Sequence, residues 1–201
     1  MLLTILDQSF RYSNDINSIE NCLKQVEEIL EKNELYLSVM KVDEVEVYQE
    51  FQEYLIEHIA SVKTINVEVQ TLKQVMDESV ISLQSYLDGA LLEIKKLADE
   101  FYQGAGKESW NKLNQLLEAL LWISQTIETV QNKQVYQNAS DYKAIAASLR
   151  EEFANLECAL TDQDMVLTGD IIKYEIIAIL DQLLGIVTTT IDNEVARHDL
   201  S

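Results

Sequence analysis

Apolar residues recur with heptad spacing through one long stretch in the middle of the chain. Between residues 76 and 101 they alternate at intervals of four and three, which is typical of a helix packed along its whole length. The residues at these positions are Met76, Val80, Leu83, Leu87, Ala90, Ile94, Leu97 and Phe101. The pattern predicts a helix from about Thr71 to Gln103, roughly 50 Å long at 1.5 Å per residue.

The rest of the C-terminal part is patterned as three further helices. A second helix would bury Leu113, Leu116, Leu120, Ile123, Ile127 and Val130. Beside this seam lie Trp110, Leu117, Leu121 and Trp122. A third helix would bury Val135, Ala139, Tyr142, Ala146, Leu149, Phe153, Leu156 and Leu160. A fourth would bury Ile172, Ile176, Ile179, Leu183 and Ile186.

The connections between these helices are predicted to be short. Gly104-Ala105-Gly106 can end the first helix with a left-handed glycine and reverse the chain within a few residues. Thr161, followed three residues later by Asp164, resembles a capping box at the start of the fourth helix. Such connections place consecutive helices antiparallel, so we expect a bundle of four long helices over residues 71–201.

Residues 1–70 have a different pattern, in which apolar residues alternate with polar ones in several short runs. In order, the pattern predicts a strand at 1–6, a polar loop at 7–14, a helix capped by Asp15, a hairpin at 35–47 that turns at Asp43-Glu44, a helix at 51–59 and a strand at 65–70. This order of elements is the ferredoxin-like arrangement, βαββαβ. We therefore expect an α+β fold, mostly α, in which a small ferredoxin-like unit at 1–70 precedes the bundle at 71–201.

Charge is the most unusual feature of the composition. The 201 residues include 35 acidic and 15 basic side chains, which gives a formal net charge of −20. Such a surface repels nucleic-acid phosphates and anionic lipid headgroups, so we expect neither a nucleic acid nor a membrane as partner. It is compatible with a partner that carries basic patches, and equally with selection for solubility alone.

The location of the protein is inferred from its apolar segments and its cysteines. The most apolar window, residues 171–191, contains Lys173, Glu175 and Asp181, which argues against a membrane helix. The N-terminal residues lack the basic stretch of a signal peptide. Cys22 and Cys158 lie far apart, outside any metal-binding spacing, as is usual in reduced proteins. We expect a cytoplasmic protein.

Residues that could carry chemistry are few. The two histidines, His58 and His198, form no metal-ligand pair, and the Gly104 segment lacks the P-loop spacing. Carboxylates cluster near residues 27–31, 43–46 and 162–170, and clusters of this kind are usually solvated faces. We predict no catalytic, cofactor-binding or metal-binding residue and no cofactor.

Two functional hypotheses follow. The first is a non-enzymatic interaction protein, an acidic helical adaptor or chaperone-like module that binds another protein. The alternative is a small-molecule- or metal-binding helical bundle, a class that includes an enzyme whose carboxylates converge only in the fold. Apolar positions outside the main seams also predict a homodimer. These positions include Val75, Leu91, Trp122 and Leu184.

Overall fold

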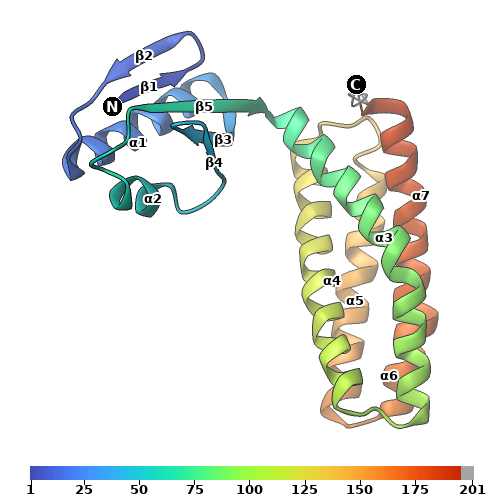
Figure 1. Cartoon of the computed structure of the whole chain (residues 1–201). Helices are drawn as coiled ribbons and strands as arrows, with labels where there is room; N and C mark the ends of the chain where they lie inside the picture. The colour runs from blue at the N-terminus through green and yellow to red at the C-terminus, as the bar shows by residue number, and fades with distance from the viewer. Residues whose placement is uncertain (196–201) are drawn as a thin grey trace. The chain divides into compact units, whose positions relative to one another are not determined.

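The structure is a computed structural model that describes residues 1–195 (Figure 1). The chain divides into two compact units, Met1–Val75 and Met76–Ser201, which are described separately below. His198, considered above as a candidate ligand, lies outside the described residues.

The first unit is a five-stranded mixed sheet with two helices. Its elements are β1 (Leu2–Ile5), β2 (Gln8–Arg11), α1 (Ile16–Asn33), β3 (Leu35–Val42), β4 (Val45–Val47), α2 (Phe51–Glu57) and β5 (Thr64–Thr71). The strand order is β2-β1-β5-β3-β4, with β1 and β5 parallel and every other neighbouring pair antiparallel.

The ferredoxin-like prediction is therefore wrong, although the α+β class is confirmed. The error lies at residues 7–14, which were expected to form a loop, whereas Gln8–Arg11 is a strand that forms a hairpin with β1. The turn is hidden in the sequence because Leu6, rather than a glycine or asparagine, adopts the left-handed conformation there, with φ 52°. The residues of β2 are mostly exposed, so they show no apolar alternation.

The core of this unit lies between the sheet and α1. Its buried side chains include Leu3, Ile5, Ile19, Cys22, Val26, Met40, Val42, Ile65 and Val67. The register of β3 against β5 shifts between Leu37 and Val39, which is a β-bulge at Ser38. Met40 and Val42 therefore belong to this cluster, although alternation from Leu37 would have placed Val39 in it, and Val39 is buried outside the cluster.

Two local predictions in this unit are confirmed. Asp15 caps α1, and its carboxylate accepts a hydrogen bond from the backbone N–H of Ser18 at 2.8 Å. Asp43 and Glu44 form the turn of the β3–β4 hairpin with φ values of 47° and 73°, both in the left-handed region. Positive φ at both central residues is the type I′ geometry that suits a two-residue hairpin.

The second unit consists of helices, and its first helix begins within the preceding unit. Its elements are α3 (Leu72–Gln103), α4 (Lys107–Lys133), α5 (Asp141–Thr161), α6 (Met165–Asp170), the π-helix η1 (Ile171–Ile176) and α7 (Ile177–Glu194). The predicted long helix agrees with α3 within one residue. It starts with a capping box, in which the backbone N–H of Thr71 donates to Gln74 at 2.8 Å and the N–H of Gln74 donates to the Thr71 hydroxyl at 3.3 Å.

The prediction of four helices is wrong in number, because six helical segments follow Thr71 within the part of the chain that the structure describes. The expected fourth helix is divided into α6, η1 and α7, which follow one another without an intervening loop. Its predicted cap is also displaced. Thr161 still belongs to α5, and Asp164 is the N-cap of α6, accepting a hydrogen bond from the N–H of Leu167 at 2.9 Å.

The heptad seam of α3 faces the interior of this unit, and every residue of it except Ala90 is buried. Figure 1 shows α3, α4, α5 and α7 side by side within the second unit. Polar contacts join elements that are distant in sequence, such as Gln84 with Thr188 at 3.0 Å and Tyr142 with Thr190 at 2.7 Å. No helix within residues 1–195 combines the length and apolarity needed to cross a bilayer.

Candidate functional site

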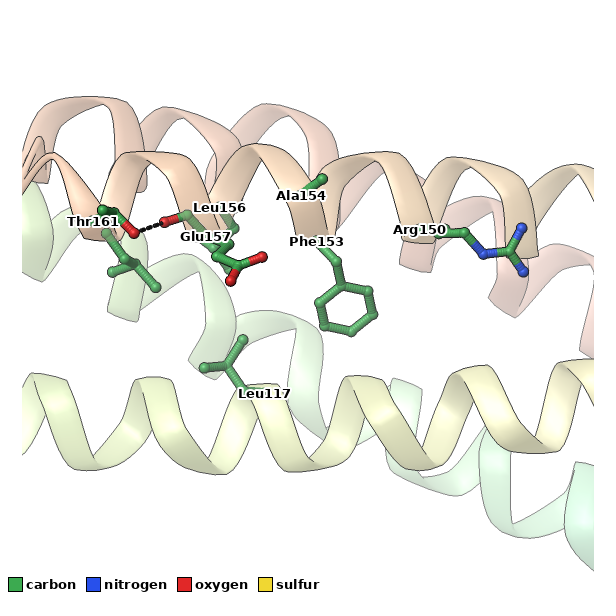
Figure 2. Close-up of a pocket in the computed structure, with 8 residues that line it drawn as sticks. Leu117, Arg150, Phe153, Ala154, Leu156, Glu157 and Thr161 are labelled. Carbon is green, nitrogen blue, oxygen red and sulfur yellow. Dashed lines mark hydrogen bonds between the residues drawn. The ribbon is translucent and has the colours of Figure 1, made fainter.

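An open groove with a volume of about 650 Å³ lies between α4 and α5 (Figure 2). It is lined by Leu117, Arg150, Phe153, Ala154, Leu156, Glu157, Leu160 and Thr161. Figure 2 shows Leu117 reaching from α4 toward α5, and Phe153 reaching from α5 toward α4. The groove therefore has apolar side chains on both walls, and most of its lining comes from α5.

Helical spacing explains why these residues share one surface. On α5, Arg150, Phe153, Glu157 and Leu160 follow one another at intervals of three and four, so they lie along one face. On α4, Leu121 follows Leu117 by four residues and lies one turn further along the same face. The side chain of Leu121 is 57% exposed, so the apolar surface extends beyond the groove itself.

The two charged residues of the groove differ in their partners. Arg150 is paired with Glu128 across the two helices, with 3.2 Å between its Nη2 and the carboxylate oxygen. The carboxylate of Glu157 has no cationic partner within residues 1–195. The groove is thus apolar along much of its lining, with one neutralised charge and one carboxylate available to a cation.

The lining residues provide binding groups and little for catalysis. They include one carboxylate, one guanidinium and one hydroxyl, and no histidine, cysteine or second carboxylate. The hydroxyl, that of Thr161, donates to the backbone carbonyl of Glu157 at 2.8 Å in the last turn of α5. General acid–base catalysis needs a proton donor and acceptor aimed at one reacting group. This groove is better suited to holding an apolar surface.

The histidines and cysteines considered in the sequence do not form a site in the described part of the chain. His58 is exposed, its ring stacks on Tyr54 with 4.3 Å between centroids, and its Nδ1 lies 2.9 Å from the Tyr54 carbonyl oxygen. Cys22 is buried in the sheet unit, and burial raises the pKa of its thiol to about 11. Cys158 is exposed on α5.

The carboxylate clusters do not converge on a metal position. Among residues 1–195, no group of three or more His, Cys, Asp and Glu side chains is arranged to hold a metal ion. Asp43 instead accepts hydrogen bonds from the N–H of Thr64 at 2.7 Å and the N–H of Lys63 at 3.1 Å. Partial burial alone would raise the pKa of Asp43, but these hydrogen bonds outweigh it and the pKa is lowered.

A polar cluster lies where α3 meets the π-helix. Tyr102 donates to Asp170 at 2.6 Å, and this hydrogen bond raises the pKa of Tyr102 to about 12. Lys173 pairs with Asp99 at 2.8 Å and lies 5.2 Å from the centre of the Tyr102 ring. π-Helical turns are frequent at functional sites. Here these four side chains are engaged with one another, so the cluster joins α3 to the end of α6 and to η1.

The aromatic residues at the turn between α3 and α4 are consistent with a packing role. Phe101 is buried, and Trp110 meets it edge to face with 5.5 Å between centroids. The hydroxyl of Tyr102 donates a hydrogen bond to Asp170. A binding surface formed by these three rings finds less support than the groove between α4 and α5.

Comparison with known proteins identifies two families. Residues 78–185, more than half of the chain, match the family described as a domain of unknown function (DUF8042). The chain belongs to this family. Residues 1–71 match the family described as the TP0873 N-terminal domain. No curated protein and no solved structure matches the chain.

No site residue was predicted from the sequence, and the leucines and the phenylalanine of the groove were assigned to packing. Leu117 and Leu121 were recognised as lying beside the seam of the second helix, whereas Phe153 and Leu160 were placed in the seam of the third. In the structure Leu156 is buried, while Phe153 and Leu160 are only half-buried. The one sequence feature that could have indicated the groove was the presence of apolar residues outside the main seams. Such residues are equally compatible with burial against another helix of the same unit.

Proposed function

We propose that this protein is a non-enzymatic interaction protein whose helical unit binds another protein through the groove between α4 and α5. The observation that carries the proposal is the open apolar groove, continued by the exposed side chain of Leu121. Apolar surface removed from water contributes about 25 cal/mol per Å². Contiguous apolar surface on a soluble domain therefore commonly marks an interaction site.

The shape of the groove favours a protein over a small molecule. Sites for small molecules are concave and enclose about 70–90% of the ligand surface, whereas this groove is open along two helices (Figure 2). A metal-dependent bundle finds no supporting arrangement among residues 1–195. The interaction hypothesis is therefore preferred to the alternative of a small-molecule- or metal-binding bundle.

A cytoplasmic location and a homodimer belong to the same proposal. Both cysteines are free, Cys22 in the core and Cys158 on the surface, which agrees with a reducing compartment.

Trp122, one of the positions behind the dimer prediction, remains 37% exposed, and Leu91 and Leu184 are half-buried. Light scattering at low and moderate salt measures the mass directly. A monomer at tens of micromolar would rule the dimer out.

The proposed function is tested by filling the groove without changing its charge. Ala154 is an exposed residue of the lining, and Ala144 is an exposed residue of the same helix outside it. Full-length protein carrying Ala154→Trp or Ala144→Trp is used to isolate binding proteins from the native cells, beside the wild type. We expect a protein that is held by the wild type and by Ala144→Trp and is lost with Ala154→Trp.

Two results would contradict the proposal. Retention of the same protein by Ala154→Trp would show that binding uses another surface. Absence of any protein held specifically by the wild type would remove the interaction hypothesis itself. Circular dichroism of the three proteins is the control, because equal helical signals show that the substitutions leave the bundle folded.

A further inference from the structure

We infer that the groove between α4 and α5 receives an amphipathic helix that carries a lysine or arginine opposite Glu157. This inference rests on the proposed function and adds the chemistry of the partner. It combines three observations on the described residues, which are the length of the groove, the pairing of its charges and the charge of the whole chain.

The dimensions of the groove suit a helix. From Arg150 to Thr161 the lining spans twelve residues of α5, which corresponds to about 16 Å, or about three helical turns. An occupant helix of that length presents apolar residues at i, i+3 or i+4, and i+7 on one face. Binding of such a stripe in an apolar groove is a recurrent mode of peptide recognition. Leu117 and Phe153 provide the two facing walls.

The charged residues of the groove favour a partner with a positively charged side chain. Arg150 is already neutralised by Glu128 at 3.2 Å. Glu157 is exposed, lines the groove and has no cationic partner within residues 1–195. An apolar helix that covered Glu157 without supplying a positive charge would remove water from an unpaired carboxylate, which is unfavourable. A lysine or arginine near this position avoids that cost and adds a hydrogen-bonded ion pair.

The charge of the chain acts in the same direction over longer distances. At a net charge of −20, the protein attracts basic partners and repels acidic ones during encounter. It also disfavours a second copy of this chain as the occupant, since that copy would bring another −20 to the contact. The groove and the overall field therefore favour the same class of partner, a basic amphipathic helix.

Two synthetic helical peptides of fifteen residues test the inference. Both carry the same leucine stripe, and their polar positions are all lysine in one and all glutamate in the other. Binding to the full-length protein is measured by fluorescence anisotropy at physiological salt. We expect the lysine peptide to bind at least about tenfold more tightly than the glutamate peptide, and Ala154→Trp to abolish its binding while Ala144→Trp does not.

A matched pair of charge variants locates the effect. Glu157→Gln removes the carboxylate of the groove, and Glu151→Gln removes an exposed carboxylate of the same helix outside the lining. Glu157→Gln should weaken the lysine peptide about two- to fivefold, the range of an exposed ion pair, and Glu151→Gln should have a smaller effect. Glu157→Lys should weaken the lysine peptide further and strengthen the glutamate peptide.

Several outcomes would overturn the inference. Equal effects of Glu157→Gln and Glu151→Gln would mean that only the general field attracts the peptide. Equal binding of both peptides, or of neither, would remove the requirement for a basic helix. A dimer that Ala154→Trp dissociates would identify a second copy as the occupant. If the native partner still depends on Ala154 while the peptides fail, the proposed function stands and only the assigned chemistry of the partner falls.

Discussion

The sheet unit and the helical unit form their backbone hydrogen bonds between different parts of the chain. In the sheet unit, Leu3 pairs with Ile65, so two strands from opposite ends of the unit form its parallel centre. In the helical unit the backbone hydrogen bonds are local, and distant segments meet only through side chains such as Gln84 and Thr188. The sheet therefore forms only when the first and last strands of the unit pair with each other. Each long helix, by contrast, makes its backbone hydrogen bonds within its own segment.

Both units leave large apolar side chains exposed, among them Ile16 and Val45 in the sheet unit, and they differ in that the groove lies on the helical unit. The sheet unit covers its core with α1, and the buried side chains of both elements form one cluster. The helical unit buries the seam of α3 but leaves the groove beside α4 open, with Leu121 largely exposed. This contrast places the candidate binding surface on the helical unit, although that unit is the more regular of the two.

Removal of the sheet unit is the most severe way to test this contrast. If the hydrogen bonds of the helices are local and their core is their own, a fragment of residues 71–201 should stay folded. We expect its circular dichroism spectrum to be strongly helical, with cooperative thermal unfolding. A spectrum rich in sheet, or one without helical structure, would contradict the division of the chain at Thr71.

Core truncations should show that both units depend on close packing. Leu87 is fully buried on α3 and Ile94 is 5% exposed, while Ile65 is fully buried in β5. Replacement of each by alanine should lower the free energy of unfolding by about 2–5 kcal/mol, since each leaves a cavity. Urea denaturation provides the measurement. Losses within about 0.5 kcal/mol, the range of surface sites, would place the α3 seam in solvent.

Replacement of two glycines of the helical unit by alanine should change the stability of the protein in opposite directions. A Cβ at Gly169 would lie 3.0 Å from a ring carbon of Tyr102 and 3.3 Å from the Ala98 carbonyl oxygen, whereas nothing lies within 4 Å of a Cβ at Gly89. Gly89→Ala should stabilise the helix by about 1 kcal/mol. Gly169→Ala should destabilise by about 1–2 kcal/mol, as overpacking does.

The measurement for this pair is the shift in the midpoint of urea unfolding. Stabilisation by Gly169→Ala would mean that Tyr102 moves freely, despite its hydrogen bond to Asp170. Gly185→Ala is a second control, since nothing lies within 4 Å of its Cβ either.

The smallest expected effect is a pH dependence specific to the sheet unit. The folded pKa of Asp43 is lowered from the ordinary value of 3.8, because the hydrogen bonds from Thr64 and Lys63 outweigh partial burial. The resulting stability is present above the unfolded pKa and is lost as pH falls through the folded pKa. The difference in melting temperature between wild type and Asp43→Asn should therefore shrink as pH falls below about 4. A difference that stays constant to pH 2 would contradict this role of Asp43.

The helices could be predicted because their determinants lie close together in the sequence. The heptad spacing located α3 within one residue. Asp15 and the Asp43-Glu44 turn were identified for the same reason, since each acts on backbone within a few residues. The π-helical segment escaped prediction, because apolar residues in its sequence fit an ordinary helix equally well.

The sheet order and the candidate site could not be obtained in this way. β2 lacks an apolar face, and its turn depends on a strained Leu6, so only its pairing with β1 reveals it. The bulge at Ser38 likewise exists only in the register of β3 against β5. For the groove, the sequence indicated that Leu117 and Leu121 lie outside the main seam, but not whether another helix would cover them.

The sequence by itself therefore determined the α+β class, the long helix and most of the local caps and turns. Tertiary structure alone decided the strand order, the division of the last helix and the exposure of Phe153 and Leu121 beside a groove. The physical reason is the range of the interactions involved. Helical periodicity and capping act over three or four residues, whereas strand pairing and surface exposure depend on which distant segments pack together.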